Sequence, residues 1–507
     1  MLAFARTAVV IGIQAFPVTV EIDVSPGLPA FNIVGLPEAA VRESRERVKA
    51  AIKNCGYPFP TQRITLNLAP ADLKKEGAGL DLPIAAAILC AVGVLPQEEV
   101  ERLLLIGELS LDGSVKPTRG ALPITLAARQ WDIDGLLTPT ENAAEAGVVK
   151  GLKVYPIKHL SELVEFLHKR LTIAPVAVEW QELFTRQEVT EDFEDVVGQE
   201  QAKRALEITA AGGHNVLMTG PPGSGKTMLA RRLPSILPPL TFEETLETTC
   251  IYSVAGLLPQ NQSLILQRPF CAPHHTISEA GLIGGGSIPR PGQVSLAHNG
   301  VLFLDELPEF KKDTLEALRQ PLEDGQVTVS RATVSITFPA RVMLVCAQNP
   351  CPCGHLGDTR HACTCQPQQI SRYRSRLSGP LLDRIDIHIE VPAVPYQELS
   401  QSRRGEPSAQ IRDRVTEARR LQAQRLAGTH LHCNAQMSAR EIRKYCTLDK
   451  TSQAFLENAA SKLGLSARAY HKILKIARTI ADLEASERIQ TKHIAEAVQY
   501  RSWDRRL

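Results

Sequence analysis

A glycine-rich loop with a lysine and a threonine is the first group whose residue types and spacing could do chemistry. Residues 220–227 read GPPGSGKT, follow the apolar run NVLMT and precede the helix-forming run MLARRL. This matches the phosphate-binding pattern G-x-x-x-x-G-K-[ST] in its expected strand–loop–helix context. Backbone N–H groups of such a loop face phosphates at the positive end of a helix. We expect ATP and Mg²⁺ to be bound here, with the lysine on the β- and γ-phosphates and the threonine on Mg²⁺, by Gly220, Pro221, Pro222, Gly223, Ser224, Gly225, Lys226 and Thr227.

Two adjacent carboxylates complete this candidate nucleotide site. Residues 300–306, GVLFLDE, form an apolar run that ends in Asp305 and Glu306. Hydrolysis of a nucleoside triphosphate depends on positioning and charge stabilisation, so it needs one carboxylate for Mg²⁺ and one for the attacking water. Carboxylates at a strand end also occur in solvated turns, but their position after a phosphate loop favours catalysis. We predict that Asp305 holds Mg²⁺, directly or through water, and that Glu306 polarises the water.

Four of the eleven cysteines form a third group, two C-x-C pairs separated by nine residues: Cys351, Cys353, Cys363 and Cys365. Four thiolates this close together suit a tetrahedral Zn²⁺ site in a reducing compartment. The usual first spacing is C-x₂-C, so His355 or His361 could replace one cysteine. Unligated thiols or a disulfide pair are the other possibilities. We predict a structural zinc clip.

These groups must be positioned by a chain of 507 residues, a length that predicts three or four domains. In residues 1–168, alternating apolar runs such as VTVEIDV and RITLNL predict strands, and VRESRERVKAAIKNCG and DLPIAAAILCAVG predict helices. The Asp-Gly of IGELSLDGSVKP predicts a hairpin. We therefore expect a mixed α/β domain over residues 1–168. Residues 169–192 show weak periodicity and are expected to form a linker.

Beyond the linker, the pattern changes twice. Residues 193–395 alternate strands with helices, as in a parallel sheet with crossover helices. Residues 396–507 contain only amphipathic helical patterns, for example IRDRVTEARRLQAQRLAG and ARAYHKILKIARTIADLEAS. We predict an α/β core followed by a helical domain.

Composition narrows the function classes. The chain has 44% hydrophobic and 22% charged residues, as ordinary globular proteins do. No apolar run approaches the roughly 18 residues that span a bilayer, so we expect a cytoplasmic protein without membrane contact. Its 57 basic and 55 acidic side chains give a net charge of +2. Any binding of nucleic acid must therefore come from local loops.

Longer motifs resemble a known family. The runs DFEDVVGQEQAKRALEITAAGGHNVLMTGPPGSGKT, RPFCAPHHTIS and LSGPLLDRIDIHIEVP look like those of magnesium-chelatase-like AAA+ proteins. Over its whole length the chain resembles the ComM (YifB) family. The resemblance implies an α/β AAA+ P-loop parallel sheet with a helical lid at residues 396–507, preceded by an α+β Lon-protease-like (S5-like) domain. It also implies an ATP-driven homohexameric ring helicase that promotes DNA branch migration during homologous recombination in natural transformation.

The resemblance extends the catalytic site. In such motors a sensor asparagine follows a strand lying between the two strands that carry the phosphate loop and the carboxylates, and Asn349 in RVMLVCAQNP matches it. Arg384 in LLDRIDI matches an arginine finger that reaches the neighbouring subunit. A surface salt bridge with Asp383 or Asp386, which would contribute little, is the alternative interpretation of this residue. Arg468 resembles a second sensor at the start of a lid helix, and Arg478 is its rival.

Two insertions typical of the same clade carry the expectation of DNA binding. Residues 276–300 resemble a glycine-rich insert within helix 2. Residues 325–342, GQVTVSRATVSITFPARV, alternate as a β-hairpin and resemble the pre-sensor hairpin of ring helicases. Arg331 lies near the tip of that hairpin and is the predicted contact to single-stranded, duplex or branched DNA.

The resemblance to Lon-type proteases departs from the catalytic pattern. The serine position of that fold coincides here with Gly79 and the lysine position with Leu122, neither of which can act as nucleophile or base. Lys74, Lys75 and Ser114 are near but match only with a shifted register. We therefore expect no peptidase, and a fold reused for DNA or subunit contacts. A chelatase-type motor that remodels a protein without DNA remains the alternative to a helicase.

Overall fold

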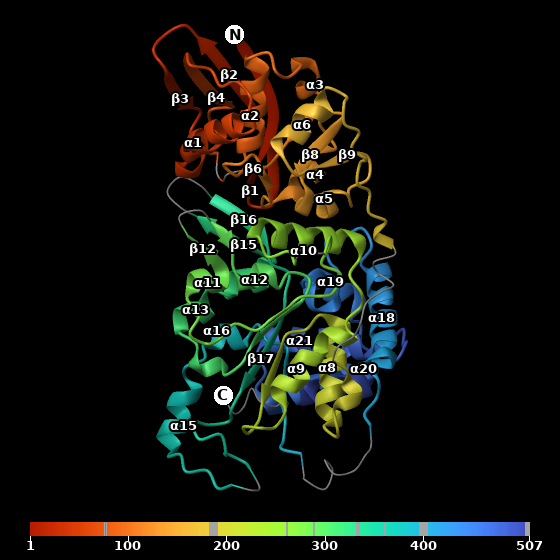
Figure 1. Ribbon diagram of the computed structural model, residues 1–507. Helices are drawn as coiled ribbons and strands as arrows, with labels where there is room; N and C mark the ends of the chain where they lie inside the picture. The colour runs from red at the N-terminus through yellow and green to blue at the C-terminus, as the bar shows by residue number, and fades with distance from the viewer. Residues whose placement is uncertain are drawn as a thin grey trace. The chain divides into compact units, whose positions relative to one another are not determined.

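The structure is a computed structural model that describes residues 1–75, 77, 79–181, 191–259, 262–286, 289–330, 335–358, 361–394 and 404–501 (Figure 1). The chain forms two compact units. The first contains Met1–Arg186 and Phe242–Leu266, and the second contains Gln187–Thr241 and Gln267–Leu507.

The first unit is built on a mixed seven-stranded sheet of order β3-β4-β2-β1-β5-β8-β9. Strands β1, β2 and β4 pair antiparallel, whereas β5, β8 and β9 pair parallel. The strands are β1 (Leu2–Ile11), β2 (Gln14–Ser25), β3 (Ala30–Val34), β4 (Arg63–Ala69), β5 (Leu103–Leu105), β8 (Gly135–Pro139) and β9 (Lys153–Ile157), with a separate hairpin of β6 (Glu108–Leu109) and β7 (Val115–Lys116). The expected α+β fold and the Asp-Gly hairpin are thus confirmed.

Helices cover this sheet because their apolar faces need burial. Every residue of α2 is buried, as its almost entirely apolar sequence DLPIAAAILCA requires. The helices are α1 (Ala39–Asn54), α2 (Asp81–Ala91), α3 (Gln97–Glu101), α4 (Ala121–Ala128), α5 (Thr140–Ala146), α6 (Leu160–Leu167) and α10 (Phe242–Ala255).

Helix α10 belongs to the first unit although it follows the phosphate loop in sequence. Its Leu246 and Cys250 pack with Leu122 and Val149 in one apolar cluster. The sequence analysis expected each domain to be one continuous stretch of the chain. It therefore did not place α10 in the first unit. The expected linker also differs in part, since Val176 and Val178 donate backbone hydrogen bonds to Val154 and Gly147.

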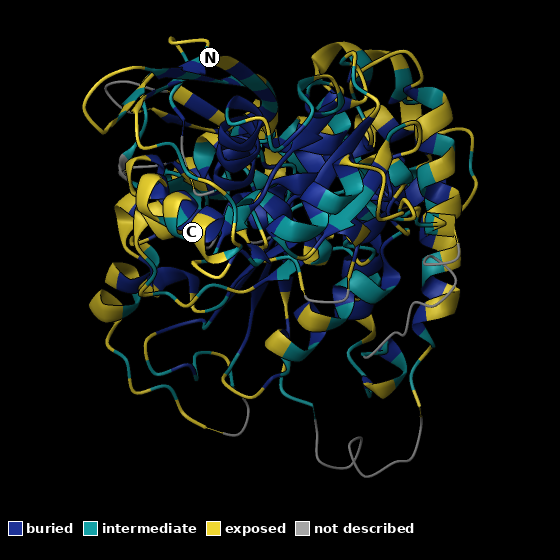
Figure 2. Cartoon of the chain, turned by 45° about the horizontal axis from the view of Figure 1, so that its top comes forward, coloured by how far each residue is buried: buried dark blue, intermediate teal, exposed yellow. Residues whose placement is uncertain are grey.

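The second unit contains a five-stranded, all-parallel sheet of order β11-β14-β17-β10-β18. Its strands are β10 (Val216–Thr219), β11 (Phe270–Cys271), β14 (Val301–Leu304), β17 (Met343–Gln348) and β18 (Ile387–Glu390). Strands β10, β14 and β17 are buried throughout, because helices cover a parallel sheet on both faces (Figure 2). This is the predicted parallel-sheet core.

Short elements connect these strands, and two hairpins occupy the predicted insertions. The hairpins are β12 (Gly284–Gly285) with β13 (Arg290–Pro291), and β15 (Gln326–Ser330) with β16 (Ser335–Pro339). The helices are η1 (Phe193–Asp195), α8 (Glu200–Gly212), α9 (Lys226–Ile236), α11 (Glu279–Ile283), α12 (Gln293–Leu296), η2 (Leu307–Glu309), α13 (Lys312–Glu316), α14 (Arg319–Asp324), α15 (Pro367–Arg374) and α16 (Gly379–Leu382).

The predicted helical lid is present and shares one apolar core with the parallel sheet. It consists of α18 (Ser408–Arg425), η3 (Asn434–Gln436), α19 (Ala439–Tyr445), α20 (Lys450–Leu463), α21 (Ala467–Leu483) and α22 (Thr491–Gln499). Helix α19 was not predicted, although Ser438 and Glu441 form a capping box at its start. Among the described residues, no helix combines the length and apolar character needed to cross a bilayer.

Candidate functional site

The predicted phosphate loop connects β10 to α9. Gly223 and Gly225 have φ angles of 73° and 87°, in the left-handed region that glycine adopts without strain. Lys226 begins α9 and is 8% exposed, and its Nζ donates to the carbonyl oxygens of Gly220 and Pro221 at 2.8 and 2.9 Å. Burial lowers the pKa of Lys226, and nearby Asp305 opposes the shift. The ammonium group therefore lies across the loop, where a phosphate, as a charged acceptor, would compete for it.

Thr227 and Asp305 are in direct contact. The Thr227 Oγ1 donates to Asp305 Oδ2 at 2.7 Å, and Asp305 Oδ1 accepts from the Glu306 N–H at 2.9 Å. The contact forms because β10 and β14 both run parallel to β17, so the phosphate loop that leads to Thr227 and the end of β14 before Asp305 lie at the same edge of the sheet. Mg²⁺ prefers such hard oxygen ligands. The residues present therefore fit Mg²⁺.

Glu306 combines an unusual backbone conformation with a close imidazole. Its φ of 53° lies in the left-handed region, which costs a non-glycine residue about 1–3 kcal/mol. Its Oε2 lies 3.2 Å from His275 Nδ1. His275 follows β11, the strand beside β14, and directly precedes the predicted insert at residues 276–300. Sequence reasoning missed this residue, for which the only signal was the His-His pair ahead of the insert.

The predicted sensor strand is in the expected place. Strand β17 lies between β10 and β14, and Asn349 follows it directly. The Asn349 Oδ1 accepts a long hydrogen bond of 3.4 Å from Lys226 Nζ.

Gln199 is a second residue that sequence reasoning missed. Its Nε2 donates a hydrogen bond to the Ser224 carbonyl at 2.6 Å and so stabilises the phosphate loop.

The two arginines predicted to act as finger and second sensor both make contacts at the turn that follows α16. The Nη1 of Arg384, which follows α16, donates to the Pro380 carbonyl at 2.7 Å, and its Nη2 is ion-paired with Glu323. Arg468, at the start of α21, pairs with Asp383 at 3.2 Å. Both arginines are therefore anchored around one short segment, the turn that follows α16.

Arg478, the rival of Arg468, has a structural role. It is buried, and its Nε donates to Asp482 Oδ1 at 3.1 Å while Nη1 donates to the Glu487 carbonyl at 2.7 Å. Its donors are used inside the lid, so we exclude this alternative.

Arg331 lies outside the described residues, between β15 and β16 of the predicted hairpin.

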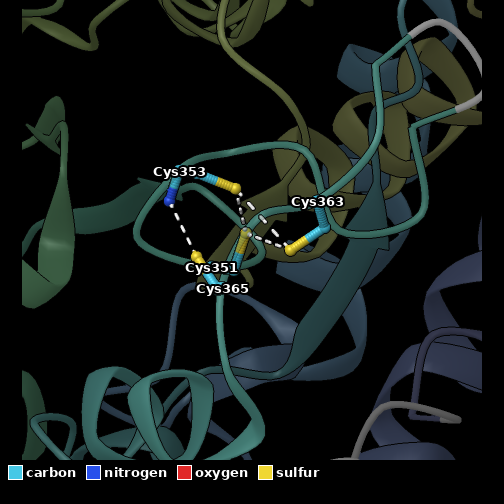
Figure 3. A group of neighbouring side chains, drawn as sticks. All are labelled: Cys351, Cys353, Cys363 and Cys365. Atoms are coloured by element: carbon cyan, nitrogen blue, oxygen red, sulfur yellow. Dashed lines mark hydrogen bonds between the residues drawn. The ribbon is translucent and has the colours of Figure 1, made fainter.

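The four clustered cysteines converge (Figure 3). The Sγ of Cys351 lies 3.4 Å from that of Cys353 and 3.7 Å from that of Cys363, and the last two are 3.6 Å apart. Four sulfurs at about 2.3 Å from a tetrahedral Zn²⁺ would be about 3.8 Å from one another. The ligand atoms of all four cysteines lie within 4.8 Å of one another, so the set fits zinc.

The four cysteines differ in acidity: backbone hydrogen bonds favour the thiolate of Cys353, whereas desolvation and the neighbouring Cys353 and Cys351 raise the pKa of Cys365 to about 12. The Cys353 N–H donates to Cys365 Sγ at 3.3 Å. Backbone hydrogen bonds from His355 and Thr364 lower the pKa of Cys353 to about 5. The predicted histidine substitutes lie apart from this set, because His355 and His361 instead group with Asp358, at 3.1 and 3.4 Å.

The positions of the Lon-type catalytic residues are structural in this chain. Leu122 is fully buried with Cys250 of α10, which occupies the surroundings of the expected lysine position. A β-carbon on Gly79 would lie 3.2 Å from Thr118 Cγ2. Leu122 is therefore part of an apolar cluster, and Thr118 leaves little room for a side chain at position 79.

Family models match most of the chain. The model described as "Magnesium chelatase, subunit ChlI" matches residues 192–399, "Subunit ChlI of Mg-chelatase" matches 20–142, and "Magnesium chelatase, subunit ChlI C-terminal" matches 405–501.

Individual relatives extend the similarity to the full length. The chain is 47% identical to the uncharacterized protein YifB of Salmonella typhimurium over 508 residues, which cover 100% of this chain and 98% of the relative. It is 46% identical to the competence protein ComM of Haemophilus influenzae over 512 residues, with the same coverage. Lon protease 2 of Bacillus subtilis is 31% identical over 157 residues, 28% of this chain and 27% of that protein, which supports the Lon-like fold.

Proposed function

Because this chain belongs to the ComM (YifB) family of magnesium-chelatase-like AAA+ proteins, we propose that it is an ATP-driven DNA helicase that promotes branch migration. The hairpin β15–β16, which directly precedes the sensor strand β17, is the observation that supports a role on DNA. One face of this hairpin is buried through Val327 and Phe338. Its other face presents exposed hydroxyl pairs, Thr328 with Thr337 and Ser330 with Ser335, and polar groups of this kind bind DNA backbones.

The residues of the nucleotide site divide the work of hydrolysis. Lys226 would transfer its hydrogen bonds from loop carbonyls to the β- and γ-phosphates, and Thr227 and Asp305 would hold Mg²⁺. When bound, Mg²⁺ supplies charge neutralisation at the phosphates. Glu306 would polarise water once His275 releases it, and Asn349 would orient that water.

A ring is required if Arg384 acts as a finger. Its anchoring beside Arg468 favours a shared role for the two arginines at the nucleotide of a neighbouring subunit, where positive charge stabilises the developing phosphate charge. We propose a homohexamer, in which six copies of each hairpin surround DNA and act as a multivalent set.

Zinc is part of the proposal. The sulfur separations and the convergence of all four thiols favour Zn²⁺ bound by Cys351, Cys353, Cys363 and Cys365. The ion would serve as a structural clip, since four cysteines leave no open position for substrate.

The second candidate is a chelatase-type motor that remodels a protein partner without DNA. It is favoured by the family models, whose descriptions name magnesium chelatase for three segments of the chain. The Haemophilus influenzae relative, named a competence protein, instead favours a role in DNA uptake or recombination.

An ATPase assay with single-stranded, duplex and forked DNA separates the two candidates. We expect DNA to stimulate turnover and to bind less tightly as salt rises. Arg331→Ala should reduce DNA binding, stimulation and unwinding, whereas Arg443→Ala, at an exposed arginine of α19, should not. A wild-type protein that neither binds nor responds to any DNA would refute the helicase and leave the protein-remodelling motor. Normal unwinding by Arg331→Ala would refute the role of that residue alone.

A further inference from the structure

The side chain of Arg384 is held by a carboxylate on the helix that precedes the hairpin β15–β16. Its Nη2 is ion-paired with Glu323, and Nη1 donates to the Pro380 carbonyl at 2.7 Å. Within the described residues its Nε is buried without a hydrogen-bond partner. The Arg384 side chain is 15% exposed and that of Glu323 is 61% exposed. Water screens an ion pair with so exposed a carboxylate, so another anion could replace it at little cost.

The backbone of Arg384, in contrast, is fixed to the sheet. The Asn215 Nδ2 donates to the Arg384 carbonyl at 3.0 Å, and Asn215 Oδ1 accepts from the Leu344 N–H of β17 at 2.8 Å. One asparagine thus joins the turn after α16 to the sensor strand. Only the side chain of Arg384 is then left to exchange partners.

Glu323 lies at the end of α14, immediately before the hairpin. Gly325 ends the helix with a φ of 65°, and β15 begins at Gln326. The Gly325 carbonyl accepts from the Ala340 N–H at 2.8 Å, which closes the base of the hairpin. Only two residues separate Glu323 from β15, so a displacement of Glu323 also moves the base of the hairpin.

A second contact ties the same two segments together. A hydrogen bond from Ser378 lowers the pKa of Glu316 in α13. The Ser378 Oγ also accepts from the Leu381 N–H at 3.4 Å, at the start of α16. The segment of α13 and α14 thus holds α16 near its beginning, through Glu316, and just after its end, through Glu323.

We infer that Glu323 is a positioning residue that couples Arg384 to the hairpin at residues 326–339, an inference that rests on the proposed role of Arg384 at a neighbouring nucleotide. The γ-phosphate and Glu323 are rival anions for one guanidinium. When Arg384 turns to the phosphate, the contact with Glu323 is lost and the base of the hairpin is released. When phosphate leaves, the pair forms again and holds the hairpin. The exchange transmits the nucleotide state of one subunit to the DNA-facing element of the next.

Glu323→Gln tests this coupling through two measurements on the full-length assembled protein. The first is ATP turnover without DNA. Turnover should rise in Glu323→Gln, because Arg384 no longer has to break an ion pair before it reaches the phosphate. Arg384→Ala should instead abolish turnover. The second is hydrogen–deuterium exchange of the amides at 326–330 and 335–338, with and without ATP and Mg²⁺. In the wild type, nucleotide should speed this exchange, and in Glu323→Gln the dependence on nucleotide should fall about fivefold or more.

Two control variants complete the test. Glu323→Asp keeps the charge and should restore the dependence on nucleotide. Glu417→Gln removes a comparably exposed carboxylate from the pair with Arg420 and should change neither measurement. A loss of turnover in Glu323→Gln like that in Arg384→Ala, or an unchanged dependence on nucleotide, would overturn the coupling alone. Full turnover in Arg384→Ala would overturn the proposed role of Arg384, and the coupling with it.

Discussion

Gly354 lies directly against Pro222, so closely that a β-carbon on Gly354 would come within 2.6 Å of the Pro222 Cδ. The first residue belongs to the loop of clustered cysteines and the second to the phosphate loop. The cysteine loop therefore packs against the nucleotide site, although no cysteine is predicted to touch ATP. A clip that orders residues 351–365 would also order one wall of the phosphate loop.

The contact predicts that metal removal affects ATP binding. Cys351→Ser/Cys353→Ser should lose the roughly one Zn²⁺ per chain that a four-cysteine site binds. It should also raise the KM for ATP, because the loop that supports Pro222 is released. Metal analysis and steady-state ATPase kinetics on the two proteins give both results.

The histidines beside the cysteines provide the matched control. His355→Ala should keep zinc, because His355 groups with Asp358 instead of with the four sulfurs. Equal zinc in the wild type and the double serine variant would rule out the site. Loss of zinc with an unchanged KM would show that the clip does not support the phosphate loop.

Substitutions of Lys226 and Glu306 should affect nucleotide binding and ATP hydrolysis in different ways. Lys226→Ala should weaken nucleotide binding and hydrolysis together, because its Nζ lies across the phosphate loop. Glu306→Gln should keep nucleotide bound in an assembled ring and stop turnover, since the phosphate cradle stays intact. Nucleotide affinity and turnover, measured beside Lys49→Ala at an exposed lysine of α1, distinguish the two. Normal turnover in Glu306→Gln would remove this residue from the catalytic site.

Arg384→Ala should abolish hydrolysis without unfolding the chain, since fingers of this kind contribute about 10³–10⁵ in kcat. Mixing it with Lys226→Ala should restore part of the activity, because each chain supplies the half-site that the other lacks. Turnover of the mixture across subunit ratios measures this. Mixed rings that form but stay inactive would count against a shared site.

Much of the second unit was predictable because local patterns there agree with the tertiary fold. The loop at 220–227 and the run GVLFLDE each combine a strand with the residues that follow it, so periodicity and motif specify the same edge of the sheet. The strand order then brings Asn349 between them. Full-length relatives confirm the family that these motifs indicated.

Other features depend on contacts between distant segments, which no local pattern encodes. His275 becomes relevant only because β11 pairs with β14, which brings its ring to Glu306. Gln199 reaches the phosphate loop from the turn before α8. Helix α10 joins the first unit because its Cys250 and Leu246 complete an apolar cluster around Leu122. Arg478 and Arg468 share one helix but differ in burial, a difference that the sequence around them does not show.

Glu145 makes the packing around α10 sensitive to pH. This residue of α5 is 4% exposed, and burial raises the pKa of its carboxyl group, although a hydrogen bond from Asn142 Nδ2 at 2.6 Å opposes the shift. Because the folded state holds the proton more tightly than the unfolded state, the stability from protonation is present at low pH. It is lost as pH rises through the folded pKa.

Glu145→Gln keeps the acceptor for Asn142 and removes the buried charge, so it should unfold at a higher temperature than the wild type at pH 7.5. The gap should close as pH falls toward the ordinary pKa of a glutamate, because the wild-type side chain is then neutral as well. Each 1 kcal/mol corresponds to about 2–4 °C in a unit of 150–250 residues. Thermal unfolding of both proteins from pH 7.5 to 5 measures the gap, with Glu141→Gln on the exposed side of α5 as the control. Parallel curves for wild type and Glu145→Gln over this range would mean that the carboxylate is already accommodated as an anion.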